Sequence, residues 1–247
     1  MKRLLIIVTL FFIQTGIAQS AEIKLLAAGV VQEVFAELVP KFEESSGNKV
    51  MVTWTGGADI RKRIAAGEQY DVVVTAGTDI DTFIEQGKMP RGSRVDLVKS
   101  GIGVGTRAGS TKPDISSGEA LKKTLLSVRS IGYSTGASGV YLVSLIAQMG
   151  ISDAVKPKLK ETPSGVRIGT LIASGDAEIG FQQISELIHE PGVDYLGPLP
   201  ADVQKVTIYS AGISNGTKQI EAAMALVKSI TAPDAASVIK QHGMEPG

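Results

Sequence analysis

The chain is most informative at first through what it lacks. It has no cysteine among its 247 residues, which excludes disulfides, thiolate metal sites and a cysteine nucleophile. Its two histidines lie far apart in the sequence, so we expect neither a metal nor a cofactor. Lys and Arg number 25, as do Asp and Glu, which leaves no basic surplus to hold nucleic acid. A chain of this length buries an adequate core without disulfides.

The N-terminal segment has the pattern of a secretory signal. Lys2 and Arg3 form a positive start, residues 4–13 an apolar run, and residues 18–20 (Ala-Gln-Ser) a small-residue cleavage site. The run is too short to span a bilayer, and no later run reaches the length of a membrane span. We expect residues 1–21 to be a signal peptide and the mature protein to work in the periplasm without membrane insertion; a retained N-terminal anchor is the alternative.

Strand-like runs alternate with helical runs along the rest of the chain, which predicts an α/β fold with mainly parallel sheets. The expected strands are 23–27, 49–54, 71–75, 102–106, 130–134, 177–181 and 206–211. The expected helices are 30–47, 58–66, 79–86, 119–127, 138–149, 167–174, 216–230 and 233–241, with a turn-rich connector at 196–200.

This outline predicts two lobes in one discontinuous unit. We assign residues 22–100 and 212–247 to the first lobe and residues 101–211 to the second. The chain then crosses between the lobes twice, which predicts a two-strand hinge. Ligands of such sheets bind at the carboxyl ends of the strands, so we expect a ligand cleft between the lobes.

The most informative stretch is the turn Thr55-Gly56-Gly57, which follows a strand and opens a helix. Glycines there expose backbone N–H groups at a helix N-terminus, where the peptide dipoles favour an anion. Arg61 follows within about one turn and can bind a carboxylate with two hydrogen bonds. A solvated surface position beside Lys62 is the alternative for Arg61.

Similar helix starts recur in both lobes, at Gly29, at Ser138-Gly139 and at residues 164–165. A single such glycine is ordinarily turn chemistry, but the repetition predicts an anion site lined by several helix N-termini. Ser138 is an N-cap candidate as well as a ligand candidate. Gln183 follows a strand, and its amide can donate to an oxyanion or serve the fold. The candidate ligand-binding residues are Gly29, Thr55, Gly56, Gly57, Arg61, Ser138, Gly139, Val166 and Gln183.

Three segments carry a resemblance to a known family: residues 64–76 (IAAGEQYDVVVTA), 138–141 (SGVY) and 172–181 (IASGDAEIGF). With the order of the elements, they resemble a type II periplasmic solute-binding protein of the molybdate-binding-like branch of ABC transporter receptors. The resemblance covers essentially the whole mature chain. It implies two lobes that close around an oxyanion by a hinge motion, a monomer, and an ABC permease as partner.

The chain also departs from that branch. The resemblance implies a serine where this chain has Gly29, a serine pair at Gly56-Gly57, and a tyrosine at Gln183. Loss of these hydroxyl groups enlarges the cleft, and Arg61 adds a fixed positive charge. An organic di- or tricarboxylate fits this change better than molybdate.

One subgroup of the branch looks like aconitate isomerases, which interconvert trans- and cis-aconitate by a proton shift. This chain is similar to that subgroup. That chemistry needs a base near the carbon that loses its proton and donors for the charge that develops. Asp59 and Tyr141 are candidate bases, but the sequence does not mark either one. Two functions therefore stay open: an exported receptor for a small organic anion, which we favour, and an aconitate isomerase on the same scaffold.

Overall fold

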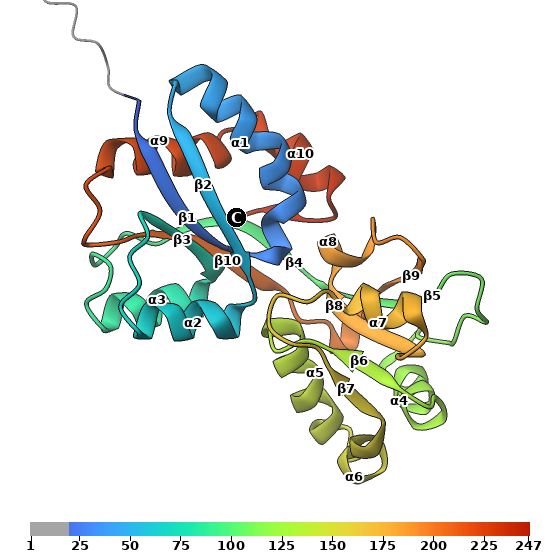
Figure 1. Ribbon diagram of the computed structural model, residues 1–247. Coiled ribbons are helices and arrows are strands. Elements are labelled where there is room, and N and C mark those ends of the chain that lie inside the picture. Colours follow the sequence, from blue (N-terminus) through green and yellow to red (C-terminus); the bar gives the residue numbers. More distant parts are fainter. Residues whose placement is uncertain (1–19) are drawn as a thin grey trace, which may run out of the picture.

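The structure is a computed structural model that describes residues 20–247, so nearly all of the predicted signal segment lies outside the described residues. Two lobes, each built on its own sheet with flanking helices, lie side by side and are joined by crossing strands (Figure 1). The predicted two-lobed α/β fold is confirmed.

Lobe 1 is built on a six-stranded sheet. Its strands, in spatial order, are β11 (Glu245–Pro246), β4 (Val95–Ser100), β10 (Thr207–Ile213), β3 (Val72–Ala76), β1 (Glu22–Ala28) and β2 (Lys49–Thr55). Helices α1 (Gln32–Ser46), α9 (Ile220–Ile230) and α10 (Ala235–Gln241) cover one face, and α2 (Gly57–Ala65) and α3 (Gly77–Glu85) cover the other (Figure 1). From Leu25 to Ala28, strand β1 is buried on both faces, as expected for a central strand with helices on either side.

Lobe 2 is built on a five-stranded sheet. Its strands, in spatial order, are β7 (Leu159–Glu161), β6 (Ile131–Tyr133), β8 (Ile179–Gln183), β5 (Ile102–Arg107) and β9 (Val193–Pro198). Its helices are α4 (Gly118–Ser127), α5 (Ala137–Gln148), α6 (Ser152–Val155), α7 (Ile168–Ser174) and α8 (Ile184–Leu187). Its hydrophobic residues form clusters separate from the core of lobe 1, so each lobe has its own packing.

The prediction of mainly parallel sheets is wrong. Strands β1, β2 and β3 pair in parallel, as do β6, β7 and β8. The strands that carry the chain between the lobes, β4, β5, β9 and β10, make antiparallel pairs. The predicted connector at 196–200 is mostly strand β9, whose Gly197 and Pro198 have the composition of a turn. Strand β4 has no counterpart among the predicted strands.

Two crossings form the hinge. The first runs from β4 through Gly101 into β5, and the second returns from β9 into β10. Because β10 pairs with β3 and β4 from Thr207 onward, the chain re-enters lobe 1 at that residue, five positions before the predicted boundary at 212. Gln204 joins the two crossings: its Oε1 accepts from the Ile102 N–H at 2.9 Å and its Nε2 donates to the Ile102 carbonyl at 3.0 Å.

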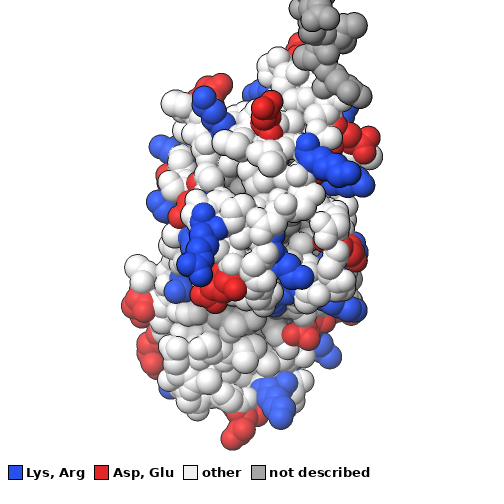
Figure 2. Space-filling model, turned by 90° about the vertical axis from the view of Figure 1, so that its left-hand side faces the viewer, with Lys and Arg blue, Asp and Glu red and all other residues white. Residues whose placement is uncertain are grey.

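The outer surface carries charges of both signs. On the face seen in Figure 2, Lys and Arg side chains are interspersed with Asp and Glu and form no continuous basic stripe. Within residues 20–247, no single helix is long and apolar enough to cross a membrane. The adjacent helices α9 and α10 are together long and apolar enough for a membrane span, but they are bent by 63° relative to each other.

Candidate functional site

A cleft of about 730 Å³ lies between the two lobes. Its lobe 1 wall contains the turns that open three helices, at Gly29, Gly56-Gly57 and Gly77. Its lobe 2 wall contains residues 134–138, residues 165–167, Gln182, Gln183 and Glu186, and the second crossing contributes residues 205–209. Carboxyl ends of strands from both sheets therefore meet at one cavity, as the sequence pattern predicted.

Helix N-termini bring partial positive charge to this cleft. Helices α2, α3 and α5 begin at Gly57, Gly77 and Ala137, all of which line it. The first N–H groups of a helix have no partner within the helix and carry partial positive charge. The cleft is thus preorganised for an anion by backbone groups from both lobes.

Gly56 and Gly57 have different surroundings. A Cβ at Gly56 would overlap the Ser164 hydroxyl and come within 2.8 Å of the Gly165 nitrogen, both in lobe 2. A Cβ at Gly57 would have its nearest neighbour, Arg61 Nη1 in its own lobe, at 3.6 Å. Gly56 therefore permits contact between the lobes, whereas Gly57 opens onto the cavity.

Arg61 lines the cleft but is already paired. Its Nη1 lies 3.1 Å from Asp79 Oδ2, and its side chain is 46 % exposed. Asp79 also accepts from the Thr75 hydroxyl at 3.1 Å. Arg61 therefore reaches the cleft as one half of an ion pair, which reduces the positive charge that we expected from it.

The predicted pair Ser138-Gly139 is divided by the structure. Ser138 lines the cleft, is buried, and shares a hydrogen bond of 3.3 Å with the Ser134 hydroxyl. Gly139 does not line the cleft. A Cβ there would overlap the Ser134 carbonyl, so Gly139 serves the packing of α5 against the preceding turn.

Gln183 lines the cleft, but its amide is occupied by the hinge. In the orientation that satisfies both of its polar atoms, the nitrogen donates to the Ser100 hydroxyl and the Gly101 carbonyl, each at 3.0 Å. The oxygen accepts from the Tyr209 hydroxyl at 3.2 Å. The expected role as an oxyanion donor is therefore not available to this amide.

The other predicted residues line the cleft without a free charge. Gly29 begins the short turn before α1, and Val166 is an exposed apolar residue of the lobe 2 wall. The Thr55 hydroxyl donates to Asp59 Oδ2 at 3.0 Å. Eight of the nine predicted residues thus lie around one cavity: Gly29, Thr55, Gly56, Gly57, Arg61, Ser138, Val166 and Gln183.

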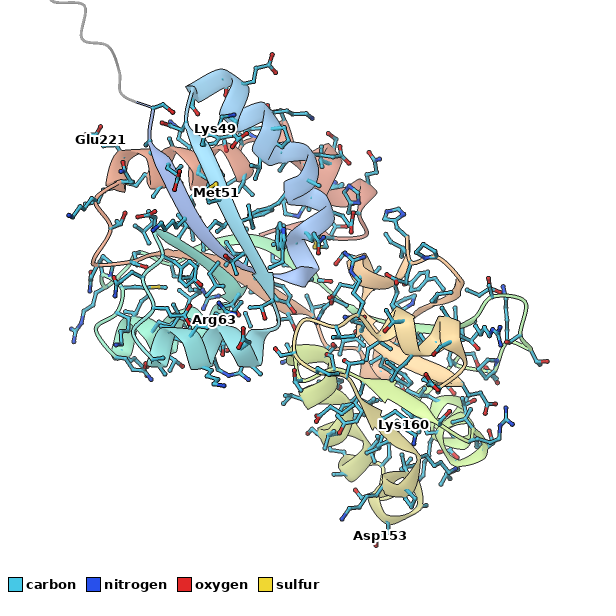
Figure 3. The ribbon with its side chains drawn as sticks, in the orientation of Figure 1. Lys49, Met51, Arg63, Asp153, Lys160 and Glu221 are labelled. Atoms are coloured by element: carbon cyan, nitrogen blue, oxygen red, sulfur yellow. The ribbon has the colours of Figure 1, made fainter. Side chains whose placement is uncertain are left out.

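Neither candidate base suits its role. Asp59 does not line the cleft; it pairs with Arg63 of α2 at 2.6 Å, and this hydrogen bond lowers its pKa (Figure 3 labels Arg63). Tyr141 lines the cleft, but its hydroxyl donates to the Val203 carbonyl at 3.0 Å. The sequence could not show where the polar atoms of these two side chains point.

Glu186 is the cleft residue of greatest chemical interest, and the sequence analysis missed it. Its Oε1 accepts from Gln182 Nε2 at 2.9 Å, and Gln182 Oε1 in turn accepts from the Ile168 N–H at 2.8 Å. Burial raises the pKa of Glu186 to about 7, although Arg167 and the Gln182 amide favour its charged form. Its position three residues beyond the end of β8 was the available signal, because ligands bind at the carboxyl ends of strands.

Three further cations line the cleft. Arg94 pairs with Asp81 and Asp96, and Arg167 is bound as described below. Lys205 has no carboxylate partner within 4 Å among residues 20–247. With Arg61, four cations line the cleft, and three of them are paired with carboxylates. The cleft lining itself contains two carboxylates, Asp79 and Glu186.

Contacts between the lobes close one edge of the cleft. Arg167, just before α7, lies 2.6 Å from Glu33 of α1 and 3.3 Å from Glu190. The Ser185 hydroxyl of α8 donates to the Val30 carbonyl at 2.8 Å. These bonds hold the start of α1 against the segment that carries Glu186.

No group of three or more His, Cys, Asp or Glu side chains in residues 20–247 is arranged to hold a metal ion. The polar groups around the cleft are instead N–H donors, cations and one carboxyl without an ion pair, which are suited to an anionic organic ligand.

Two α/β lobes, a hinge of two crossing strands and a polar cleft between them define the class of hinged ligand-binding proteins. Residues 23–245 match the family described as bacterial extracellular solute-binding protein, and the chain belongs to this family.

Two relatives carry names that refer to different small molecules, aconitate and molybdate. A protein named aconitate isomerase from Pseudomonas sp. is 35 % identical over 227 residues, which cover 90 % of this chain and 86 % of the relative. The molybdate-binding protein ModA of Azotobacter vinelandii is 28 % identical over 233 residues, which cover 92 % and 90 %. The chain is therefore a molybdate-binding-like solute-binding protein that also resembles an aconitate isomerase.

Solved structures agree on the fold. The periplasmic molybdate-binding protein of Azotobacter vinelandii has a TM-score of 0.77 at 21 % identity, covering 91 % of this chain and 99 % of that one. The sulfate-binding protein SubI from Mycobacterium tuberculosis H37Rv has a TM-score of 0.75 at 19 % identity, covering 92 % and 87 %. Both support the type II solute-binding architecture.

Proposed function

We propose that this protein is exported to the periplasm and binds an organic tricarboxylate of the aconitate type in the cleft between its lobes. The observation that carries the proposal is the set of anion-binding groups at the cleft: several helix N-termini and four cations line it. Arg61, Arg94 and Arg167 are paired with carboxylates, and Lys205 has no carboxylate partner within 4 Å among residues 20–247. A ligand with three carboxylate groups can be contacted by several of these groups at once, from both lobes.

The size of the cavity supports an organic ligand. At about 730 Å³ the cleft is within the range of pockets that bind small organic molecules. The glycines at positions 29, 56 and 57 bring no hydroxyl group into it. Val140, Val166 and Val206 add apolar surface that a carbon skeleton can contact and that a bare oxyanion does not need.

A second candidate function is the isomerisation of the bound aconitate. It is favoured by the name of the 35 % identical relative and by Glu186, a cleft carboxyl whose pKa of about 7 suits a proton-transfer group. If turnover is absent, the same cleft serves a receptor that delivers its ligand to an ABC permease. We expect a monomer in either case.

Binding and turnover are tested on the purified mature protein. Calorimetry with trans-aconitate, tricarballylate (the saturated analogue), molybdate and sulfate distinguishes the ligand classes, and solution scattering detects closure of the lobes. We expect the two tricarboxylates to bind and to reduce the radius of gyration. Binding of molybdate or sulfate alone would overturn the proposal.

Turnover is followed by proton NMR with trans-aconitate in heavy water. Formation of cis-aconitate with deuterium incorporation establishes the isomerase. Binding of trans-aconitate without conversion or exchange establishes the receptor.

A further inference from the structure

We propose that Glu186 is the catalytic base that moves the proton between two carbon atoms of the bound tricarboxylate, and that Gly29 keeps its Oε1 accessible to the substrate. This inference rests on the proposed isomerisation and assigns it a residue that the sequence did not identify.

The first support is the position of the carboxyl group. Glu186 lines the cleft, and a hydrogen bond from Gln182 fixes its Oε1 at 2.9 Å. Gln182 is itself buried and anchored at the start of α7 by the Ile168 N–H. The carboxyl group is therefore held in one orientation by a chain of two hydrogen bonds, as a group that removes a proton from carbon must be.

The second support is a contrast between the two cleft carboxylates. Asp79 is bound to Arg61 and to the Thr75 hydroxyl, so its carboxyl group already has partners within lobe 1. Glu186 has no ion pair within 4 Å among residues 20–247, because the nearby Arg167 is bound to Glu33 and Glu190. A carboxylate without a bound cation keeps its basicity.

The third support is Gly29, across the lobe boundary. A Cβ at this position would lie 3.3 Å from Glu186 Oε1, closer than an ordinary contact. Any other residue would place its side chain against the carboxyl group, whereas glycine leaves this side of Oε1 open. The backbone of Gly29 is outside the left-handed region, so conformation does not require glycine there. Access of the substrate to the Glu186 carboxyl group explains why position 29 is a glycine.

The reaction balances with one proton carrier. Glu186 takes a proton from the CH2 carbon of aconitate, and the C–H electron pair becomes part of an allylic anion that extends into the carboxylate groups. Protonated Glu186 then returns a proton to the former CH= carbon, and the double bond moves by one position. Both arms end in carboxylates, so the product is aconitate again, with the cis geometry accessible. No oxidant, reductant or second reactant is needed.

The cleft supplies what the intermediate requires. The helix N-termini and cations stabilise the negative charge that spreads over the carboxylate groups. With its pKa raised to about 7 by burial, Glu186 is present as base and as acid in comparable amounts near neutral pH. Both halves of the proton shift are then accessible to one side chain.

The central experiment compares Glu186→Gln with the parent protein. We expect conversion and deuterium exchange of trans-aconitate to fall by about 10²–10⁴-fold, the usual contribution of a general base. Tricarballylate binding should be unchanged or tighter, because the variant removes a negative charge. Glu186→Asp should recover part of the rate, and the parent's kcat/KM should decline below a pH near 7.

Glu178→Gln is the matched control. Glu178 precedes β8 at the strand's other end, lies outside the interlobe cleft and pairs with Arg129. Its variant should keep the parent's turnover. Gly29→Ala is the independent test, because it leaves Glu186 in place and brings a methyl group against Oε1. We expect its turnover to fall at least tenfold.

The outcomes separate the inference from the proposed function. If Glu186→Gln turns over trans-aconitate within threefold of the parent, Glu186 is not the base although the isomerase stands. If the parent binds tricarballylate but neither converts nor exchanges aconitate, the inference fails and the binding function stands. If the parent binds neither tricarboxylate, both fail.

Discussion

The two walls of the cleft differ in how they meet a ligand. The lobe 1 wall offers mainly backbone: its three glycine-marked turns expose N–H groups, and its cation Arg61 is neutralised by Asp79. The lobe 2 wall offers side chains: Glu186, its partner Gln182 and the buried Ser138. The backbone N–H groups of the first wall do not titrate, whereas burial raises the pKa of Glu186 on the second wall to about 7.

This difference suggests a division of labour. Backbone dipoles bind an anion without changing their own state, so they suit capture. A carboxyl group without an ion pair suits proton transfer, which needs a group that changes its protonation state. A fold that binds anions can therefore acquire a reaction when one titratable group joins its ligand site.

In the lobe 1 wall, the largest effect on closure of the lobes is expected from Gly56→Ala. Its methyl group would occupy the space of Ser164 and Gly165, so the lobes could not reach the closed arrangement. We expect tricarboxylate affinity to fall at least tenfold, or about 1.4 kcal/mol, and ligand-induced compaction to be lost in solution scattering. Gly57→Ala, whose methyl group meets only atoms of its own lobe, should still compact. Compaction of both variants alike would show that Gly56 is not a closure contact.

Arg61→Ala tests the ion pair between Arg61 and Asp79 in the lobe 1 wall of the cleft. Loss of a charged hydrogen bond to a ligand carboxylate costs about 1.5–3 kcal/mol, and the Asp79 carboxylate, left without its cation, would add repulsion. We expect calorimetry to show at least tenfold weaker binding of tricarballylate. The double variant Arg61→Ala/Asp79→Asn should recover part of the loss, because it removes the unpaired carboxylate. Unchanged affinity in the single variant would remove Arg61 from the site.

Thermal unfolding at several pH values tests the environment of Glu186 without any substrate. Its pKa of about 7 in the folded protein lies above the ordinary value of 4.5, so the folded state binds the proton more tightly. The free energy of unfolding that this group contributes is fully present below about 4.5 and is lost as the pH rises towards 7. Glu186→Gln lacks this loss, so we expect its melting temperature, relative to that of the parent, to be higher at pH 8 than at pH 5. An equal difference at both values would mean that burial does not shift this carboxyl.

Gln182→Met has the smallest expected effect and tests how Glu186 is positioned. The amide hydrogen bond favours the charged form, so its loss should raise the pKa of Glu186 further. The acidic limb of the kcat/KM profile should move to higher pH, with some loss of stability because the Ile168 N–H loses its acceptor. A profile that stays in place while kcat falls would assign Gln182 to another role.

Local patterns predicted much of the fold. The helix that ends at Gly47 was expected from its apolar spacing and its terminal glycine, and Gly47 caps α1 in the left-handed conformation (φ 73°). Strand direction was not predictable in the same way, because β4, β5, β9 and β10 take their direction from the crossing of the chain between the lobes. Strand β9 was missed because Gly197 and Pro198 give it the composition of a turn.

The candidate site divides along the same line. Glycines at helix starts follow from local rules, so the sequence could single out Gly29, Gly56 and Gly57, and all three line the cleft. It could not show which groups the amides of Gln182 and Gln183 would bind, because neighbouring residues of a strand point to opposite sides and meet different partners. Both residues line the cleft. In the structure, the Gln183 amide forms hydrogen bonds with hinge residues, and the Gln182 amide donates to Glu186.

The sequence by itself determined the class of this protein: an α/β chain with repeated anion-binding turns, which its local propensities and glycine positions specify. The tertiary structure alone decided which groups remain free to act. Arg61 forms an ion pair with Asp79. Glu186 forms no ion pair with Arg167, because Arg167 is bound to Glu33 of the other lobe. Charge pairing and burial depend on distances between residues far apart in the chain, and only the folded arrangement sets them.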